Sequence, residues 1–366
     1  MIILGIDTSC DDTSVAILKI EKEGVRRRGE GGGSGVVKLK ILSNIVSSQV
    51  KIHAQYGGVY PFLAKREHQK NLPIVFEKAL KRAKISVKEI DFIAVTVGPG
   101  LEPCLWVGVN FVKELAKELK LPIIPVNHIE AHIFANCLTW NVKQIEIEKL
   151  FPAICLVVSG GHTQLILMKN FGNYKILGET RDDAAGECLD KAARILGLGY
   201  PGGPAIAAEA AKFKVQSSKF KVRLPRPMIY QKNYDFSFSG LKTAVLYDFK
   251  NRPSKVRKSK IYIPEMTKEV QQAVIDVLIY KTLKVAKNFK ARVIILGGGV
   301  AANRELRKQF QKRIKKELPN IQYLISNIQF CTDNAAMVGV AGYFHYLKGE
   351  KYNLEKIKAN ANLKIG

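Results

Sequence analysis

The sequence has few cysteines, and no two of them have the spacing of a metal-binding or disulfide motif. The six residues are scattered along the chain, at Cys10, Cys104, Cys137, Cys155, Cys188 and Cys331. Because no C-x-x-C pair is present, we expect neither a disulfide framework nor a cysteine zinc site. Four of the six lie in or beside apolar runs, which is typical of small buried thiols.

Long hydrophobic runs are also missing. The longest apolar segments are much shorter than a membrane span, and no signal-peptide pattern precedes the first predicted strand, at residues 1–6. We therefore expect no membrane association and a cytoplasmic protein. The length of 366 residues is too great for one small core and predicts two domains.

Acidic residues are outnumbered by basic ones. The chain has 32 Asp and Glu against 58 Lys and Arg, which gives a formal net charge of +26. Part of this excess is clustered, because residues 212–260 hold fourteen basic and two acidic side chains. Such a large and uneven charge favours a polyanionic partner, above all RNA. A surface that is simply rich in lysine is the alternative.

The stretch NHIEAH carries the strongest sign of chemistry. An apolar run of strand length, Leu121–Val126, leads into Asn127, which is a plausible helix N-cap. In a helix that starts there, His128 and His132 lie four residues apart on one face, and Glu130 points away from them. Two imidazoles at this spacing can hold one metal ion. The alternative is one buried structural histidine and one surface histidine.

A distant segment, CTDNAA, strengthens the metal hypothesis. It follows another strand-length run, Ile321–Ser326, and supplies Asp333, a carboxylate that completes a two-histidine, one-aspartate site. Such a site keeps coordination positions open for substrate. A metalloprotease would instead need H-E-x-x-H, with the glutamate next to the first histidine, so this pattern fits that class poorly.

The two halves of the chain repeat one plan. Residues 2–18 predict a β-hairpin with a polar turn that includes Asp11, and residues 154–168 predict a second hairpin around SGGHT. In each half a strand, a glycine loop and a helix follow, and then a strand that leads to a predicted metal ligand. We expect an ancient duplication, with two α/β domains facing each other across a cleft where these strand ends meet.

Two glycine loops, SGGHT and LGGGVAAN, are candidates for phosphate binding. Backbone N–H groups in such turns can surround a phosphate without a cationic side chain. Tight turns without a ligand explain most loops of this kind. Neither loop is a Walker loop or a first-βαβ G-x-G-x-x-G loop, which disfavours a P-loop ATPase and a Rossmann dehydrogenase.

The remaining segments predict mostly helices. The Gly- and Arg-rich residues 21–40 are expected to lengthen the first hairpin, and residues 251–260 to form a second basic loop. Helices are expected at residues 64–84 and 182–198, a long amphipathic one at 264–289, and a closing one at 335–347. The sequence leaves open whether the two basic segments contact RNA or only solvent.

Nine segments resemble, in order, the motifs of one family, the bacterial tRNA adenosine threonylcarbamoyltransferases, formerly described as O-sialoglycoprotein endopeptidases. The resemblance implies a duplicated actin-like ATPase fold (sugar kinase, Hsp70 and actin; RNase H-like), with two domains around a central cleft. We expect these at residues 1–136 and 137–334, with a C-terminal helix at about 335–366 packing back on the first. The segments are DTSCDDTSVAI, YGGVYPFLAKREH, VGPGL, NHIEAH, VSGGHTQLI, AGECLDKAARILGLGYPGGP, DFSFSGLKTAV, GGGVAANRELR and CTDNAAMVG.

The resemblance also implies an activity. Family members transfer a threonylcarbamoyl group from threonylcarbamoyl-AMP to the exocyclic amine of the adenosine 3′ of the anticodon, in tRNAs that read codons beginning with A, and release AMP. The implied metal, iron or zinc, falls on His128, His132 and Asp333. Asp11 matches a position that matters for activity. The implied donor-binding residues are Val157, Val158, Ser159, Gly160, Gly161, Asp190, Gly203 and Asn303.

Partners follow from the resemblance in the same way. It implies tRNA, an inactive paralogue of the same fold, a small P-loop ATPase subunit, and a separate synthase that supplies the donor. A sugar kinase of this fold would not need the two histidines and the aspartate. A non-catalytic scaffold should lack these metal ligands, whereas this chain has all three. We therefore expect an acyltransferase.

Overall fold

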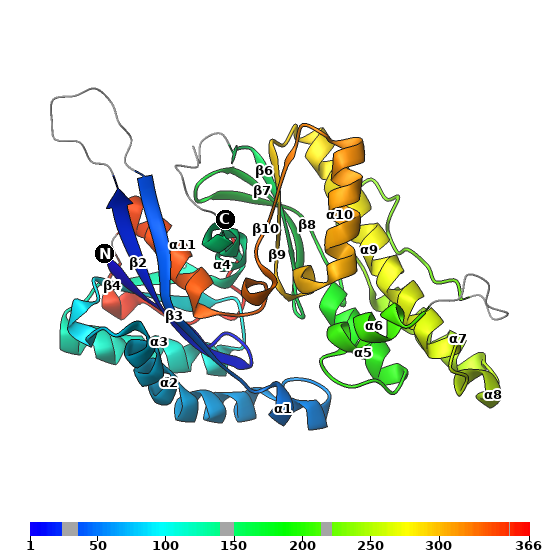
Figure 1. Cartoon of the computed structure of the whole chain (residues 1–366), viewed down its shortest axis with the longest axis horizontal. Helices are drawn as coiled ribbons and strands as arrows, with labels where there is room; N and C mark the ends of the chain where they lie inside the picture. Colours follow the sequence, from blue (N-terminus) through cyan, green and yellow to red (C-terminus); the bar gives the residue numbers. More distant parts are fainter. Residues whose placement is uncertain (24–35, 140–149, 214–221, 351) are drawn as a thin grey trace. The chain divides into compact units, whose positions relative to one another are not determined.

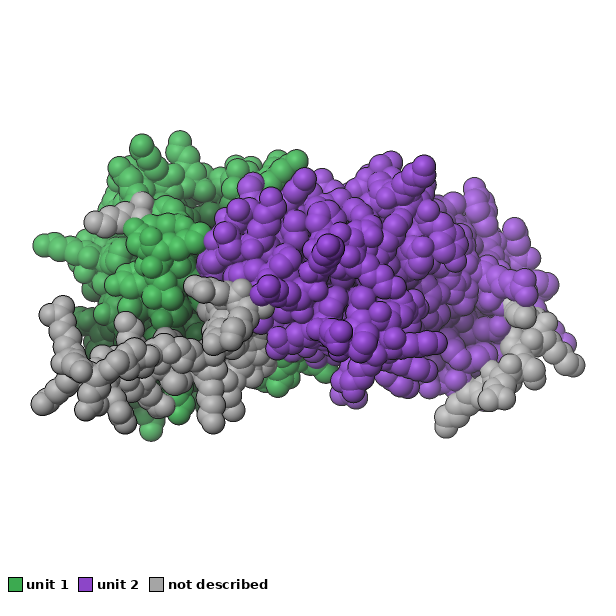
Figure 2. Space-filling model, turned by 90° about the horizontal axis from the view of Figure 1, so that it is seen from above, with its two compact units in different colours: residues 1–53, 59–149, 326–365 green, residues 54–58, 150–325, 366 purple. Residues whose placement is uncertain are grey.

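The computed structural model describes residues 1–23, 36–139, 150–213, 222–350 and 352–366. The chain forms two compact units, which Figure 2 colours separately. The first comprises Met1–His53, Val59–Lys149 and Ser326–Ile365, and the second Ala54–Gly58, Leu150–Ile325 and Gly366. Each unit is built around one five-stranded sheet.

The sheet of the first unit has the strand order β3-β2-β1-β4-β5. β1 pairs with β2 and β2 with β3 in antiparallel fashion, whereas β1–β4 and β4–β5 are parallel. The predicted first hairpin is confirmed, because Ile2 pairs with Lys19 and Asp7 with Ser14. The strands are β1 (Ile2–Asp7), β2 (Asp12–Glu23), β3 (Val36–Ser48), β4 (Phe92–Gly98) and β5 (Ile123–Asn127).

Alternating residues of β1 face different helices, as the twofold period of a strand requires. Leu4 and Ile6 are fully buried in a core with α2 (Pro61–Ala83) and α3 (Glu102–Leu119). Gly5 faces α11 (Ala335–Leu347), and a Cβ atom at Gly5 would lie 2.3 Å from the carbonyl oxygen of Ala335. The closing helix therefore packs on the first sheet, as predicted (Figure 1).

The second unit repeats this arrangement, with the strand order β10-β9-β6-β7-β8. β6 is the central strand, and it pairs antiparallel with β7 and parallel with β9. In the first unit β1 has the same place, antiparallel to β2 and parallel to β4. The predicted second hairpin and the duplication are thus confirmed. The strands are β6 (Ala153–Val158), β7 (Thr163–Asn170), β8 (Asn173–Glu179), β9 (Val293–Gly297) and β10 (Gln322–Ile325).

The helices of the second unit surround one long buried helix, α9 (Tyr262–Asn288), which contacts α5, α6, α7, α10 and β6. The long helix that the sequence predicted at 264–289 is confirmed, but its predicted amphipathic character is wrong. Buried residues recur along α9 on more than one side, because helices cover it as well as the sheet. The others are α5 (Ala185–Ile195), α6 (Gly202–Ala211), α7 (Ser239–Asn251), α8 (Ser254–Arg257) and α10 (Arg304–Glu317).

Three further segments differ from expectation. The insertion at residues 21–40 lengthens the hairpin of β2 and β3 rather than the first one, and its residues 24–35 lie outside the described residues. The predicted basic loop at 251–260 contains the short helix α8. The last helix ends at Leu347, and only the 3₁₀ turn Leu354–Lys356 follows it among the described residues.

Short elements complete the chain. They are α1 (Val50–His53), α4 (His128–Phe134) and the 3₁₀ turns Ala54–Tyr56, Val87–Glu89, Ala135–Thr139, Gly299–Ala302 and Ile328–Phe330. The six cysteines are free thiols in the structure, and all but Cys10 are buried, one more than the four that lie in or beside apolar runs. In the described part of the chain, no helix has both the length and the apolar character that a membrane crossing requires.

Candidate metal centre and glycine loops

The helix that carries the two histidines begins where the sequence predicted. α4 follows β5 directly, and Asn127 is its N-cap, with Oδ1 accepting hydrogen bonds from the backbone N–H groups of Ile129 and Glu130. A cap of this kind fixes the first turn of the helix. His128 and His132 therefore lie one turn apart on one face, and both are buried.

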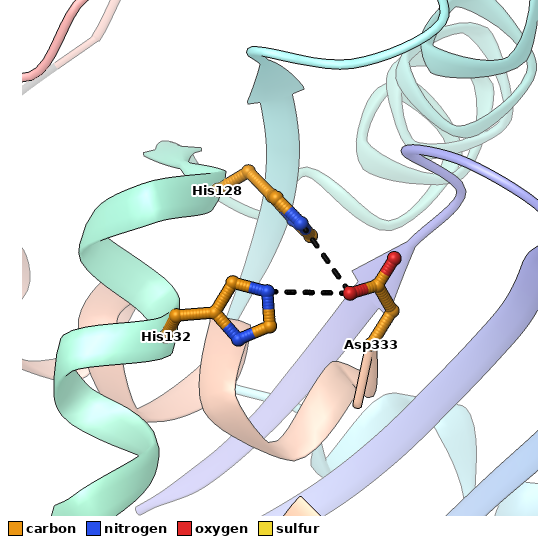
Figure 3. Close-up of side chains that lie close together, drawn as sticks. All are labelled: His128, His132 and Asp333. Atoms are coloured by element: carbon orange, nitrogen blue, oxygen red, sulfur yellow. Dashed lines mark ion pairs between the residues drawn. The ribbon is translucent and has the colours of Figure 1, made fainter. Parts of the chain in front are cut away.

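Asp333 meets these histidines in the first unit. Its Oδ1 lies 3.4 Å from His128 Nε2 and 3.2 Å from His132 Nε2. Figure 3 draws both contacts as dashed lines. The two imidazole rings stand at 77° to each other, with 4.7 Å between their centres. One ligand atom from each of the three residues lies within 4.8 Å of the others. Segments about two hundred residues apart thus supply one compact group of donors.

Three of the four ring nitrogens of His128 and His132 lack a hydrogen bond within the described part of the chain. Among the described residues, buried polar atoms without a hydrogen bond include both ring nitrogens of His132 and Nδ1 of His128. A buried polar atom without a partner costs free energy, which favours a ligand that the chain does not supply. Two imidazole nitrogens and one carboxylate are a suitable donor set for zinc or ferrous iron. The three residues fit such an ion.

A second carboxylate, Asp7, lies behind His128. Its Oδ2 is 3.7 Å from His128 Nδ1, while Nε2 of the same ring faces Asp333. Asp7 is fully buried at the end of β1, and its other oxygen accepts a hydrogen bond from the N–H of Ser9. This separation is too long for a hydrogen bond, so Asp7 acts on His128 through its charge. Sequence reasoning missed this role of Asp7.

The charges in this group favour a cation. Burial opposes the charged form of His128, but Asp333 and Asp7 outweigh burial and raise its pKa to about 9. Burial lowers the pKa of His132. Burial also opposes the charged form of Asp333, yet His128 and His132 hold its pKa well below the usual range. The pKa of Asp7 is raised, chiefly by burial.

Asp11 and Asp12 add two more carboxylates. Burial, followed by the charge of Asp333, raises the pKa of Asp11. The pKa of Asp12 is raised to about 7, chiefly by burial, and Asp333, Asp11 and Asp7 add to the effect. Four aspartates therefore influence one another here, and a bound cation would relieve the repulsion between them.

The turn that carries Asp11 is held by a buried histidine. His68 Nε2 lies 2.9 Å from the carbonyl oxygen of Cys10, and its Nδ1 lies 2.7 Å from the hydroxyl of Thr13. A carbonyl can only accept, so Nε2 carries the proton and Nδ1 accepts from Thr13. Burial lowers the pKa of His68, in keeping with this neutral form. The Asp11 backbone is thus fixed on the side of α2.

The loop SGGH in the second unit is a tight hairpin turn between β6 and β7. Ser159 closes it, because its N–H donates to the carbonyl of His162 and its hydroxyl accepts from the N–H of His162. Gly160 and Gly161 are exposed, and a Cβ atom at either would meet nothing within 4 Å. Val157 and Val158 end the buried strand β6, so their side chains belong to the core.

Asp190 and Gly203 lie around the start of α6. Oδ1 of Asp190 accepts a hydrogen bond of 2.7 Å from the N–H of Gly202. Gly202 must be glycine, because a Cβ atom there would lie 2.5 Å from Asp190 Cα, whereas one at Gly203 would meet only Leu189, at 3.9 Å. Asp190 therefore ties α5 to the N-terminus of α6, beside Gly203.

Asn303 is the N-cap of α10, and both ends of its amide have partners within the second unit. Its Oδ1 accepts from the N–H groups of Glu305 and Leu306, both at 3.0 Å. Its Nδ2 donates to Gln271 Oε1 at 2.8 Å. The capping role that the sequence offered as one alternative is present.

Asp182 is a further organising residue that sequence reasoning missed. Its carboxylate accepts hydrogen bonds from the N–H groups of Phe238 and Ser239 and from the hydroxyls of Ser237 and Ser239. These bonds lower its pKa against the opposing effect of burial. The motif DFSFSG is thereby fixed at the start of α7.

Comparison with known proteins identifies the chain. A sequence model described as TsaD, tRNA N6-adenosine threonylcarbamoyltransferase, matches residues 40–340. Relatives of that name include one from Thermosipho africanus, 48% identical with all of each chain covered. Another, from Geobacillus kaustophilus, is 44% identical, with 99% of this chain and 96% of its own covered. The chain belongs to this family.

As a member of this family, the chain is a tRNA-modifying enzyme of the acyltransferase type, as expected from its motifs. Solved structures support the predicted actin-like fold. The (R)-2-hydroxyglutaryl-CoA dehydratase component A of Acidaminococcus fermentans aligns with a TM-score of 0.50 at 13% identity, over 95% of this chain and 98% of its own. Full-length HypF aligns with a TM-score of 0.55 at 12% identity. The alignment covers 96% of this chain and 47% of the HypF chain.

Proposed function

We propose that this threonylcarbamoyltransferase uses threonylcarbamoyl-AMP as donor and the adenosine 3′ of the anticodon as acceptor, in tRNAs that read codons beginning with A. The exocyclic amine attacks the carbamoyl carbon, a C–N bond forms, the bond from that carbon to the phosphate oxygen breaks, and AMP leaves. The amine loses one proton in the process. The group formed by His128, His132 and Asp333 carries this proposal, since three protein ligands would leave coordination positions of a bound ion open.

His128, His132 and Asp333 would hold one divalent ion, iron or zinc, which supplies Lewis-acid chemistry when bound. Asp7, whose Oδ2 lies 3.7 Å from the far nitrogen of His128, would act on that ring through its charge. The excess of carboxylates in this group supports a cation rather than an anion as its ligand.

The donor nucleotide is assigned to residues of the second unit. Ser159, Gly160 and Gly161 would hold phosphate through their turn, and Val157 and Val158 would contribute backbone groups only. Neither glycine is required by the chain itself, because a Cβ atom at either would meet open space. Close approach of a ligand would explain both. Asp190, Gly203 and Asn303 would line the position of the adenosine.

Asp11 is the proposed acceptor for the amine proton, or a residue that positions the acceptor. Burial and Asp333 raise its pKa, which makes its carboxylate a better base than an exposed aspartate. Its backbone is held by a bond of 3.0 Å from the N–H of Gln49 to its carbonyl. The backbone that carries this carboxylate is therefore fixed.

The basic corner of α7 and α8 is the proposed contact for the tRNA backbone. α8 lies between α7 and the start of α9 (Figure 1), and Lys250, Lys255, Lys258 and Lys260 are exposed there. None of these lysines takes part in an ion pair with the described residues. The nearby acid, Asp248, is engaged by Arg252 and Tyr262. Unpaired lysines of this kind suit phosphate.

Further partners follow from the family. An inactive paralogue of the same fold and a small P-loop ATPase would assist turnover, and a separate synthase would supply the donor. We propose the cytoplasm as the compartment of this activity, since its acceptor is tRNA.

Metal analysis of the purified chain tests this proposal. The double variant His128→Ala, His132→Ala should lose the ion and the transfer activity but keep its melting curve within a few degrees. The wild-type chain should carry about one ion per molecule. Full metal occupancy in the double variant would overturn the assignment of these ligands.

A further inference from the structure

Glu130 lies between the two histidines in sequence but on another side of α4. Position i+2 of a helix is turned by roughly 200° from position i, whereas i and i+4 share a face. Glu130 as a whole residue is 3% exposed, and its Oε2 lies 2.7 Å from Nε2 of His345 in α11. A polar contact to α11 thus holds α4 on a side other than the one that carries His128 and His132.

His345 is charged in this arrangement. Its Nδ1 lies 2.7 Å from Oε2 of Glu350, so each ring nitrogen faces a carboxylate. A neutral imidazole has only one N–H, so the ring can donate to both carboxylates only as an imidazolium. Burial opposes this charge, but Glu130 and Glu350 outweigh it and raise the pKa of His345. Glu130 and His345 therefore form a charge-assisted hydrogen bond, which is stronger than a neutral one.

The helix of His345 also begins close to the third candidate ligand, Asp333. α11 begins two residues after Asp333, and Asn334 is its N-cap, with Oδ1 accepting from the N–H of Met337 and Nδ2 donating to the carbonyl of Thr332. Residues 335–343 of α11 are all buried. The rings of Phe134 and Phe344 pack with 4.9 Å between centres, a second contact of α4 with α11.

We propose that the Glu130–His345 ion pair braces α4 against α11 and so sets the distances between His128, His132 and Asp333. His345 is then a positioning residue for the metal centre, without touching the ion. A small rotation or slide of α4 would separate its two histidines from Asp333, and this pair resists that movement. The inference rests on the proposed metal site.

Cobalt(II) is the probe for the test, because its visible absorption reports the coordination geometry. We compare the affinity for Co²⁺ and the absorption bands in the full-length wild type, His345→Gln, Glu130→Gln and the double variant. Loss of a residue that orients metal ligands weakens binding by roughly 10- to 100-fold. Each single variant should show such a loss with altered bands, and the double variant should be no worse than either single one.

Two variants serve as controls. Glu350→Gln keeps the Glu130–His345 contact, so its Co²⁺ affinity should stay near that of the wild type. Tyr346→Ala removes a half-exposed ring of the same helix turn, which stacks on Phe92 at 5.0 Å, and tests for general loosening of α11. Its affinity should also be retained, even if its thermal midpoint falls.

The outcomes separate the brace from the metal proposal. The brace alone would be overturned if His345→Gln kept the Co²⁺ affinity and the absorption bands of the wild type. The same conclusion would follow if its loss of Co²⁺ affinity were no larger than that of Tyr346→Ala. If His345→Gln does not fold, the near-isosteric Glu130→Gln decides by the same criterion. Failure of the wild-type chain to bind Co²⁺ would remove the metal site and the brace with it.

Discussion

Asn303 and Gln271 are joined by a hydrogen bond of 2.8 Å that ties the N-cap of α10 to the middle of α9. Oδ1 of the same amide accepts from two backbone N–H groups. Since one N–H of Nδ2 donates to Gln271, the side chain has only its second Nδ2 N–H left to offer a ligand. Asn303 therefore has a structural role whether or not it also contacts the donor.

The first prediction concerns this amide. Asn303→Ala removes the cap, which costs about 1 kcal/mol, and leaves Gln271 without its partner, which costs about 1–3 kcal/mol. We expect urea unfolding to show a stability loss in this range, and calorimetric titration with AMP to show less than a tenfold loss of affinity. Asn303→Ser keeps a capping oxygen and should recover part of the stability. Unchanged stability with a large loss of AMP affinity would contradict the capping role.

A pair of glycine variants distinguishes packing from ligand contact. Gly5→Ala would place a methyl group 2.3 Å from the carbonyl oxygen of Ala335, and overpacking of this kind costs about 1–3 kcal/mol. Gly161→Ala meets no atom within 4 Å and should leave the unfolding free energy within about 0.5 kcal/mol. Its affinity for a stable analogue of the donor should fall. A Gly161→Ala chain with normal affinity would remove this loop from the donor site.

The third prediction is a pH dependence. The folded-state pKa of Asp12 is raised to about 7, above the usual value of about 4, so the folded chain holds more protons between these values than the unfolded chain. Its contribution therefore makes stability fall as pH rises through this window. Urea unfolding of the chelator-treated chain at pH 5 and pH 8 should show a smaller fall in Asp12→Asn than in the wild type. Equal falls would show that Asp12 ionises normally.

The basic corner of α7 and α8 is tested by salt dependence. Charge reversal at Lys250, Lys255 and Lys258 spares Arg257, whose guanidinium lies 5.2 Å from the centre of the Phe249 ring. The logarithmic slope of tRNA affinity against salt should lose about two to three units, since each neutralised phosphate contributes close to one.

Reversal at three exposed basic residues of α2, Lys78, Lys81 and Arg82, is the matched control and should change the slope less. Equal changes in both triple variants would mean that only total charge matters. No change in the α7–α8 variant would place the RNA contact elsewhere.

Much of the fold follows from local patterns in the sequence. Three local signals are present in the structure as the sequence indicated. They are the N-cap Asn127, the four-residue spacing of His128 and His132, and the repeated order of strands and loops. The amphipathic reading of α9 failed because it treated the helix as half exposed. Other helices cover it, and their contacts are not encoded within its own residues.

Contacts between distant segments are what the sequence leaves out. Asp7 lies in an acidic turn, and nothing local shows that it faces His128 rather than solvent. His345 is 215 residues from Glu130, and neither residue by itself indicates the other. Asp182 organises DFSFSG across more than fifty residues. Such roles depend on side-chain positions that tertiary packing fixes.

The central claim is tested most directly by mass spectrometry of nucleosides from unmodified tRNA incubated with the chain, threonylcarbamoyl-AMP and its partner proteins. The wild-type chain should produce threonylcarbamoyl-adenosine beside the anticodon together with one AMP per modified nucleoside. The variant His128→Ala, His132→Ala should produce neither. Modified nucleoside formed equally by the variant, or none formed by a folded, metal-loaded wild-type chain, would contradict the account.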